Sequence, residues 1–345
     1  METLRVVELY SGIGGMHSAL KESGIPAQVV AAIDINTTAN QIYKHNFPDT
    51  PLWNKTIEGI SLDDFNKLSF DMILMSPPCQ PFTRIGLQGD IRDSRTKSFL
   101  YILDLLPRLC KLPRFILLEN VKGFESSSAR ELLDSLCNLI HSLVCDSDRL
   151  NSISVIFFFF LCSTHPAACQ PEEEMQHDHF LYKLETGTEL QRKMKQNSVQ
   201  SVRMVQDFLE PQMEVNLEHY LLPPKTLLRY ALILDIVQPT CRRSTCFTKG
   251  YGRYVEGTGS VLQCCMETEM QSVFAGLDQC SEEEKLQRLS TLKLRYFTPR
   301  EVANLMGFPQ SFSFPEQITS KQQYKVLGNS LNVVVVSRLL QLLVS

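Results

Sequence analysis

The sequence predicts an α/β fold in which helices cover both faces of a parallel sheet. Short apolar segments typical of buried strands alternate with segments of helical periodicity over residues 1–144, and this alternation defines the fold class. Turns rich in glycine or proline directly follow two of the predicted strands. Because ligands of such sheets bind at the carboxyl ends of the strands, these turns indicate where a functional site is expected.

The order of the elements can be followed along the chain. The last predicted element but one is a helix that begins with a capping box, Thr298 to Glu301, carries Pro299 at its first position and ends at Gly307. An apolar run over residues 329–344 predicts a last element packed on the sheet. Before these, strands are expected over residues 5–10, 28–33, 70–75 and 114–118, and helices over residues 16–22, 37–47, 98–110 and 128–144.

The pattern is lost over residues 146–179, where we expect one strand at most, at the four consecutive phenylalanines of residues 153–161. Residues 185–209 are polar with a helical tendency. His177 and His179 could bind a metal ion, but no third ligand is evident, and we predict no metal site.

Composition indicates an ordinary soluble protein of about two domains. The 345 residues are 43% apolar and 21% charged. The eleven cysteines form no C-x-x-C pair, which argues against a disulfide framework or a zinc site and favours the cytoplasm, or also the nucleus. We find no signal peptide, and the longest apolar run is too short for a membrane helix. With a net charge of −4, any nucleic acid must bind a local basic patch.

A glycine turn follows the first predicted strand. Gly12, Gly14 and Gly15 lie between that strand and a helix, where backbone N–H groups can approach a ligand. Asp34 follows twenty residues after Gly14, at the end of the second strand, where a carboxylate can bind ribose hydroxyls. The spacing favours an adenosine-type cofactor. A purely structural turn is the alternative, because Ser18 replaces the third glycine of the dinucleotide pattern.

A cysteine surrounded by prolines follows the strand at residues 70–75. Pro77, Pro78 and Pro81 stiffen the loop around Cys79, and a thiolate is a strong nucleophile. The alternative is a small buried apolar residue. Glu119 ends the next strand and is expected at the same sheet edge as a catalytic acid, or else as a surface carboxylate.

These groups suit methyl transfer to carbon 5 of a cytosine. A thiolate that adds to carbon 6 makes carbon 5 nucleophilic, and a carboxylic acid at ring N3 stabilises the electron density produced. The base must leave its stack to reach such a pocket.

The chain resembles the cytosine-C5 methyltransferase family, and most closely its small tRNA (aspartic acid) branch. The ordered motifs that carry this resemblance are the segments at residues 8–15, 77–80, 119–121 and 328–330, together with the branch marker C-F-T-x-x-Y-x-x-Y at residues 246–254. The resemblance implies a Rossmann-like S-adenosylmethionine-dependent methyltransferase sheet, made of residues 1–165 plus 293–345. It also implies a smaller target-recognition domain at residues 166–292.

The family's chemistry implies S-adenosyl-L-methionine as the cofactor and a cytosine in a tRNA anticodon loop as the substrate. Cys79 is then the nucleophile and Glu119 the acid. The cofactor is expected to contact Tyr10, Ile13, Gly14, Gly15, Asp34, Ile35, Ile57, Glu58, Ser76 and Asn329.

Substrate contacts are expected from two basic segments. Residues 225–254 hold six basic residues against the single acid Asp235, with aromatic residues interleaved, so phosphates and unstacked bases can both be bound there. A solvated surface is the alternative. We select Lys249, Tyr251 and Tyr254 here, and Arg84 and Arg95 in a loop that closes over the substrate.

One family motif is missing. A pair of arginines, alternating in a strand, is expected some tens of residues after Glu119, and residues 126–202 do not contain it. The chain is therefore expected to be a variant form of lower stability and weak or absent activity. A form that binds cofactor or tRNA without turnover, a DNA cytosine-C5 methyltransferase and a nicotinamide-dependent dehydrogenase are the alternatives. The sequence predicts no membrane association and no particular oligomeric state.

Overall fold

The structure is a computed structural model of the 345-residue chain and describes residues 2–82, 89–145, 154–160, 187–211 and 216–345. The chain divides into two compact units. The first comprises Met1–Ser163, Met306–Ile318 and Ser330–Ser345, and the second comprises Thr164–Leu305 and Thr319–Asn329. This division differs from the predicted domain boundaries, since residues 293–305 and 319–329 group with the second unit.

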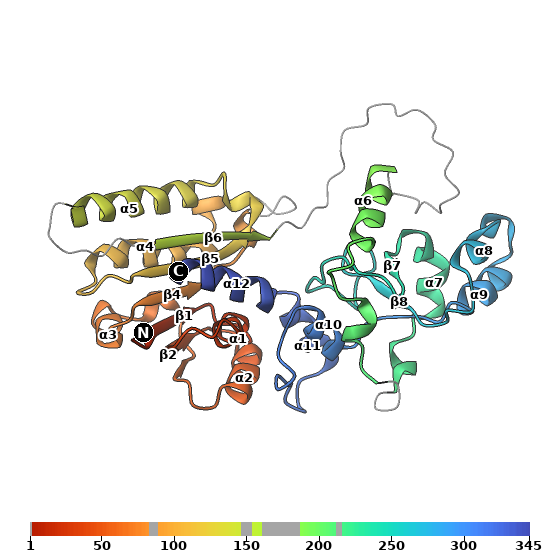
Figure 1. Ribbon diagram of the computed structural model, residues 1–345, viewed down its shortest axis with the longest axis horizontal. Coiled ribbons are helices and arrows are strands. Elements are labelled where there is room, and N and C mark those ends of the chain that lie inside the picture. Colours follow the sequence, from red (N-terminus) through yellow and green to blue (C-terminus); the bar gives the residue numbers. More distant parts are fainter. Residues whose placement is uncertain (1, 83–88, 146–153, 161–186, 212–215) are drawn as a thin grey trace. The chain divides into compact units, whose positions relative to one another are not determined.

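A parallel sheet of six strands forms the centre of the first unit, as the sequence predicted (Figure 1). Its strand order is β3-β2-β1-β4-β5-β6, and all neighbouring strands pair in parallel. From β1 the chain adds β2 and β3 on one side, and then β4, β5 and β6 on the other side. In doubly wound folds, ligands bind in the crevice at such a switch point, here between β1 and β4. The strands are β1 (Leu4–Leu9), β2 (Ala27–Ile33), β3 (Leu52–Trp53), β4 (Met72–Met75), β5 (Phe115–Val121) and β6 (Ser154–Phe160).

Helices cover both faces of this sheet. Helix α12 packs on α1, β5 and β6 on one face, while buried residues of α3, α4 and α5 join the core on the other face. The helices of this unit are α1 (Gly15–Glu22), α2 (Thr37–Asn46), α3 (Leu62–Leu68), α4 (Lys97–Leu105), α5 (Ser128–Cys145) and α12 (Val333–Val344). Every helix in the described part of the chain is too short or too polar to cross a bilayer.

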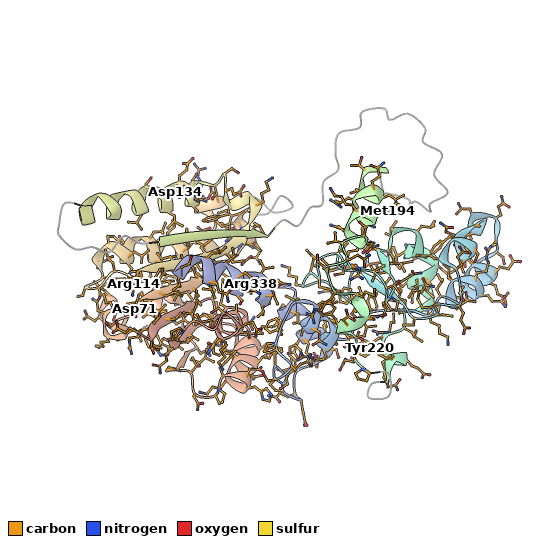
Figure 2. All side chains as sticks on the ribbon, in the orientation of Figure 1. Asp71, Arg114, Asp134, Met194, Tyr220 and Arg338 are labelled. Atoms are coloured by element: carbon orange, nitrogen blue, oxygen red, sulfur yellow. The ribbon has the colours of Figure 1, made fainter. Side chains whose placement is uncertain are left out.

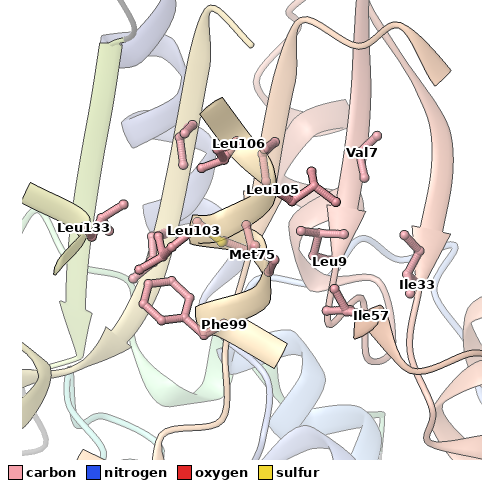
Figure 3. Packing of buried hydrophobic residues seen from close by; sticks show 14 of the residues in the cluster. Val7, Leu9, Ile33, Ile57, Met75, Phe99, Leu103, Leu105, Leu106 and Leu133 are labelled. Carbon is pink, nitrogen blue, oxygen red and sulfur yellow. The ribbon is translucent and has the colours of Figure 1, made fainter. Parts of the chain in front are cut away.

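The core under α3, α4 and α5 follows the two-residue repeat of a strand. Val7 and Leu9 are two residues apart on β1, and Met75 of β4 lies beside Leu9; each is at most 1% exposed (Figure 3). Leu118 of β5 pairs with Met75 and is equally buried. Phe99 of α4 packs on the same face. Each such side chain contributes about 1.5–3 kcal/mol through its burial, and this rigid layer holds the strand ends in register.

Polar contacts fasten the amino ends of the strands. Asp71 accepts a hydrogen bond from the N–H of Arg5 at 2.9 Å and pairs with Lys111 at 2.6 Å. The N–H of Arg114 donates to the carbonyl oxygen of Asp71 at 2.7 Å, so the residues that precede β4 and β5 lie together (Figure 2). These contacts lie at the amino ends of the strands, while the predicted site residues lie at the opposite, carboxyl ends.

The second unit has a small apolar core of its own around a three-stranded sheet in the order β7-β8-β9. Its strands are β7 (Ile236–Val237), β8 (Val261–Gln263) and β9 (Leu294–Arg295). Its helices are α6 (Gly187–Asn197), α7 (Pro224–Tyr230), α8 (Met270–Phe274), α9 (Glu282–Ser290), α10 (Pro299–Leu305) and α11 (Ser320–Leu327).

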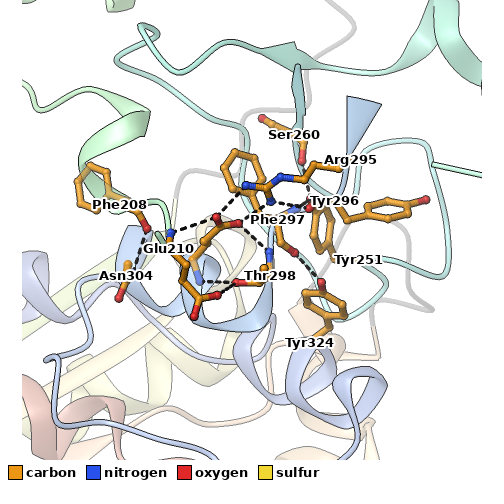
Figure 4. A network of polar contacts seen from close by, with 11 residues as sticks. Phe208, Glu210, Tyr251, Ser260, Arg295, Tyr296, Phe297, Thr298, Asn304 and Tyr324 are labelled. Atoms are coloured by element: carbon orange, nitrogen blue, oxygen red, sulfur yellow. Dashed lines mark hydrogen bonds and ion pairs between the residues drawn. The ribbon is translucent and has the colours of Figure 1, made fainter. Parts of the chain in front are cut away.

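A buried ion pair joins β9 to α10 in this unit (Figure 4). Arg295 and Glu301 are 2% and 0% exposed, and they make two hydrogen bonds of 2.7 and 2.8 Å. Glu301 also accepts from the N–H of Thr298 at 2.9 Å, while its own N–H donates to the Thr298 hydroxyl at 3.1 Å. The predicted capping box is therefore confirmed, and the same carboxylate neutralises a buried guanidinium.

Several predicted elements differ in extent. Strand β5 runs on through Glu119 and Asn120 to Val121, three residues beyond the predicted end. Helix α3 and the short strand β3 were not predicted. Of residues 185–209, only Gly187–Asn197 form an α-helix, and Val205–Phe208 form a 3-10 turn. The one strand expected in the irregular segment is present as β6, while His177 and His179 lie outside the described residues.

Candidate active site

The glycine turn between β1 and α1 is built around backbone that favours glycine. Gly12 and Gly14 have φ values of 54° and 84°, and a side chain at Gly14 would collide with the ring of Phe47. A Cβ at Gly15 would lie 2.8 Å from the hydroxyl oxygen of Ser330. The predicted cofactor residues Gly14 and Gly15 are therefore glycines because neighbouring side chains occupy the space that a Cβ would need.

Asp34 follows β2 and fastens this turn. One carboxylate oxygen accepts from the N–H of Gly12 at 2.9 Å and the other from the N–H of Asn36 at 2.7 Å. The neighbouring Ile35 side chain is 63% exposed. Asp34 therefore holds the glycine turn against the end of β2, and the predicted contact with ribose stays a prediction.

Tyr10, a predicted cofactor residue, directly follows β1. Its backbone has a φ of 55°, a strained value for a residue other than glycine, and its hydroxyl donates to Ser98 of α4 at 2.9 Å. Burial raises the pKa of the Tyr10 phenol, and the nearby carboxylates of Glu58 and Asp34 raise it further. Tyr10 therefore joins the end of β1 to α4 at the point where the strand order changes side.

Two of the predicted cofactor residues have side chains in the interior. Ile13 and Ile57 are only 2% and 4% exposed, and Ile57 belongs to the core cluster beneath the sheet. Both side chains therefore pack in the interior of the unit, and the predicted contact of these two residues with the cofactor stays a prediction.

Cys79 lies in the loop after β4, next to the switch point of the sheet. The side chain of Cys79 is partly buried. The backbone carbonyl oxygen of Cys79 accepts a hydrogen bond from the N–H of Phe82 at 3.0 Å. Asn120, fully buried in β5, donates to the carbonyl oxygen of Pro77 at 3.2 Å. A side chain at Gly123 would collide with the carbonyl oxygen of Phe82, so the loop of Cys79 is pressed against the segment that follows β5.

Glu119 lies beside this loop. Met75 pairs with Leu118 across β4 and β5, which places the next residues, Ser76 and Glu119, side by side. Burial raises the pKa of the Glu119 carboxyl to about 7, and the Ser76 hydroxyl, which donates to it, opposes part of the shift. Since an ordinary glutamate has a pKa near 4.3, this carboxyl can hold a proton close to neutral pH, as a general acid must.

Arg95 supplies positive charge near the cysteine. Its guanidinium pairs with Asp93 at 2.6 Å, and this contact, followed by the charge of Cys79, raises the pKa of the guanidinium. Arg84 lies outside the described residues.

Groups of three or more His, Cys, Asp or Glu side chains that could hold a metal ion are absent from the residues that the structure describes.

The marker segment at residues 246–254 lies in the second unit and contains two different tyrosines. Tyr251 is 3% exposed; its hydroxyl donates to the carbonyl oxygen of Ser260 at 2.7 Å and accepts from the N–H of Phe297 at 2.9 Å. Its ring packs against Phe247, Tyr296 and Tyr324 inside the unit, and the predicted contact of Tyr251 with the substrate stays a prediction. Tyr254, in contrast, is 58% exposed, with the guanidinium of Arg253 5.1 Å from its ring centre.

The basic residues around this segment also divide into two kinds. Lys249 and Arg253 are exposed, while Arg243 is bound by Asp235 at 2.9 and 3.0 Å and Arg242 by Gln200 at 2.9 Å. Arg242 and Arg243 therefore hold the unit together. Asn329 belongs to this unit as well, and its predicted contact with the cofactor stays a prediction.

The sequence assigned no role to Ser98 or Gly123, and it gave Asn120 only as part of the motif at residues 119–121. Gly123 follows Glu119 by four residues in the segment E-N-V-K-G, and this proximity was its only signal in the sequence. The contact of Ser98 is with Tyr10, 88 positions away.

The comparisons with known proteins agree with this geometry. The sheet, its strand order and the site at its carboxyl edge define an α/β methyltransferase fold. The sequence profile of the C-5 cytosine-specific DNA methylase family matches residues 4–144 and 170–345. The chain belongs to this family of cytosine-C5 methyltransferases, whose members are enzymes.

Relatives match nearly the whole chain. The human tRNA (cytosine(38)-C(5))-methyltransferase is 54% identical over 391 positions, which cover 99% of this chain and 100% of the relative. A crystal structure of a Spodoptera frugiperda DNMT2 mutant has a TM-score of 0.73 at 35% identity and covers 99% of this chain and 100% of its own. That of the S. pombe Dnmt2 methyltransferase has a TM-score of 0.71 at 34% identity and covers 99% and 98%.

The family profile skips residues 145–169, within the segment where the arginine pair was expected. The alignment with the human relative runs over 391 positions although the chain has 345 residues, so at least 46 positions have no counterpart here. The loss of pattern seen in the sequence thus coincides with a departure from the family.

Proposed function

We propose that this chain methylates carbon 5 of a cytosine in the anticodon loop of an aspartate-type tRNA, with S-adenosyl-L-methionine as the methyl donor. The observation that carries the proposal is the position of the buried Glu119 carboxyl beside Ser76, next to the loop of Cys79, where burial raises the pKa of that carboxyl to about 7. The names of the relatives support tRNA as the substrate, since the human relative, at 54% identity, is a tRNA (cytosine(38)-C(5))-methyltransferase.

The glycine turn fits S-adenosyl-L-methionine. The Ser11 hydroxyl is buried and has no hydrogen-bond partner among the described residues, and an unpaired buried polar group of this kind calls for a ligand or water. Glycines 12, 14 and 15 keep side chains away from the same turn. Tyr10, Asp34, Ile35 and Glu58 would hold the adenosine part, and Ser76 would lie toward the reacting end. When bound, the cofactor supplies an electrophilic methyl group on a sulfonium.

The chain's own residues then perform the remaining chemistry. The Cys79 thiolate adds to carbon 6 of the cytosine, which makes carbon 5 nucleophilic. Glu119 donates its proton in a hydrogen bond to ring N3 and stabilises the negative charge that develops there. After methyl transfer, loss of the proton from carbon 5 and departure of the Cys79 thiolate restore the ring. Arg95 stabilises the thiolate before attack.

Exposed groups of the second unit would bind the tRNA. Tyr254 presents a ring to solvent, and Arg253 and Lys249 add positive charge beside it. Aromatic rings stack on unpaired bases and cations contact phosphates, as single-stranded RNA loops require.

A labelling experiment tests the proposal. The protein is incubated with methyl-labelled S-adenosylmethionine and either tRNA or duplex DNA, beside a Cys79→Ala control. Label in tRNA that depends on Cys79 supports the proposal. Label in DNA alone, or equal label with the control, contradicts it.

A further inference from the structure

Asp90 has a left-handed backbone conformation. Its φ is 47°, in a region that residues other than glycine seldom adopt, although aspartate does so more often than most. Such a conformation persists only where surrounding contacts hold it, and it is often found near functional sites. The contacts of Asp90 show what holds it.

The carboxylate of Asp90 binds the first turn of α5. One oxygen accepts from the N–H of Ser128 at 2.7 Å and the other from the N–H of Ala129 at 3.2 Å. These N–H groups have no partner within the helix, and a carboxylate is favoured beside them. Because α5 begins shortly after Glu119 and Gly123, Asp90 is tied to the segment that carries the acid.

The carbonyl oxygen of Asp90 organises the chain that follows it. It accepts from the Thr96 hydroxyl at 2.7 Å and from the N–H of Asp93 at 3.2 Å. Thr96 is 2% exposed. These bonds close a compact turn over residues 90–96. The part of this turn that carries Arg95, Ser94–Thr96, packs against Gln80–Phe82, directly after Cys79, and the charge of Cys79 raises the pKa of the Arg95 guanidinium.

We propose that Asp90 is a positioning residue of the active site, which anchors the turn of Arg95 to α5 and so holds the guanidinium beside the Cys79 thiol. This inference rests on the proposed role of Cys79 as the nucleophile. Two contacts then join the chain that follows Cys79 to the chain that follows Glu119. The carbonyl oxygen of Phe82 packs against Gly123, and Asp90 binds the N–H of Ser128.

Three substitutions at Asp90 separate its carboxylate from its backbone conformation. Asparagine can adopt the same backbone and still accept a hydrogen bond, so Asp90→Asn is expected to retain most of the wild-type rate. Asp90→Ala loses both features, and its kcat is expected to fall about ten- to a hundred-fold through misplacement of Arg95. Asp90→Gly adopts the backbone freely but lacks the carboxylate, and it is expected to behave like Asp90→Ala.

Two further variants keep the test decisive if Asp90→Ala folds poorly. Ser128→Pro removes one donor to Asp90 at a helix position that tolerates proline, and a smaller loss in the same direction is expected. Asp104→Ala removes an exposed carboxylate of α4 that pairs with Arg108 and serves as the matched control with unchanged activity.

The measurements are kcat and KM on tRNA, the Kd for S-adenosylmethionine, and the rate of Cys79 alkylation by iodoacetamide at pH 7. Asp90→Ala is expected to lower kcat and slow alkylation while the cofactor Kd stays within about two-fold, because the cofactor turn does not contact Asp90. A wild-type rate for Asp90→Gly, or unchanged alkylation in Asp90→Ala, overturns the inference. Since alkylation needs no turnover, an inactive wild type would overturn the proposed function and leave this test standing.

Discussion

Ser76 and Glu119 lie side by side at the carboxyl ends of two neighbouring parallel strands. The register of β4 and β5, with Met75 opposite Leu118, makes this contact a consequence of the sheet. A buried carboxyl with a single hydroxyl donor keeps its proton far longer than an exposed one. The fold thereby creates an acid beside the loop of Cys79, and the pH dependence of the reaction should report it.

The Glu119 carboxyl should give methyl transfer a descending limb above pH 7. Burial raises its pKa to about 7, so the protonated form that donates to cytosine N3 is lost as the pH rises through that value. Glu119→Gln should lower kcat by about 10²–10⁴-fold and remove this limb. A pH–rate profile of both proteins checks the prediction, and an unchanged limb in Glu119→Gln would contradict it.

Glu8 should make the protein less stable as the pH rises from about 4.5 to 8. Burial raises the pKa of Glu8 to about 8, against hydrogen bonds from Tyr43 and from the backbone of His17, and with a further increase from Asp34. The folded state keeps a proton that the unfolded state has lost, so the free energy of unfolding should fall by up to about 1.4 kcal/mol per pH unit within that window. Urea denaturation at pH 5 and pH 8 measures the fall.

Glu8→Gln provides the control for this effect. The amide cannot ionise, so its unfolding free energy should change less between pH 5 and pH 8 than that of the wild type. The remaining change should come from Glu119, whose pKa is also raised. Equal slopes for Glu8→Gln and the wild type would show that Glu8 does not hold its proton.

Gly14→Ala should damage the cofactor turn more than Gly24→Ala damages its own turn. Both glycines have positive φ values, 84° and 70°, but a Cβ at Gly14 collides with Phe47 and lies 3.2 Å from Tyr43, while one at Gly24 meets nothing within 4 Å. Strain alone costs about 1–2 kcal/mol, and overpacking adds about 1–3 kcal/mol. Thermal unfolding and the cofactor Kd compare the two variants. Equal losses of stability and of cofactor affinity in both would contradict the prediction that the Cβ at position 14 collides with Phe47.

Tyr254 and Tyr251 should differ in what their loss affects. Tyr254→Ala removes an exposed ring and should weaken tRNA binding by about 1–3 kcal/mol without changing stability. Tyr251→Phe leaves the buried Ser260 carbonyl and Phe297 N–H without their partner and should cost about 1–3 kcal/mol of folding stability. Filter binding measures tRNA affinity and thermal unfolding measures stability for both variants. A stability loss in Tyr254→Ala together with a binding loss in Tyr251→Phe would contradict the prediction.

The sequence predicted the first unit well because its strands are apolar runs bounded by clear turns. The strand ends before Asp34 and Ser76 could be located this way, while β5 continues past Glu119 to Val121; parallel pairing brings such ends to one edge. The position of Tyr251 could not be predicted, since an aromatic residue in a basic segment has the same local pattern whether it is packed inside or exposed. Ser98 and Asp90 act through partners far away in the sequence, and no local periodicity reports such contacts.

The most direct test of the account is to trap the bond between Cys79 and cytosine. A tRNA with 5-fluorocytosine at the target position cannot lose a proton from carbon 5, so the enzyme should remain attached after methyl transfer. Mass spectrometry of the digested complex should find the nucleotide on the peptide that contains Cys79, with much less adduct in Glu119→Gln. An adduct on another residue, or methylated product released without any adduct, would contradict the assignment of Cys79 as the nucleophile.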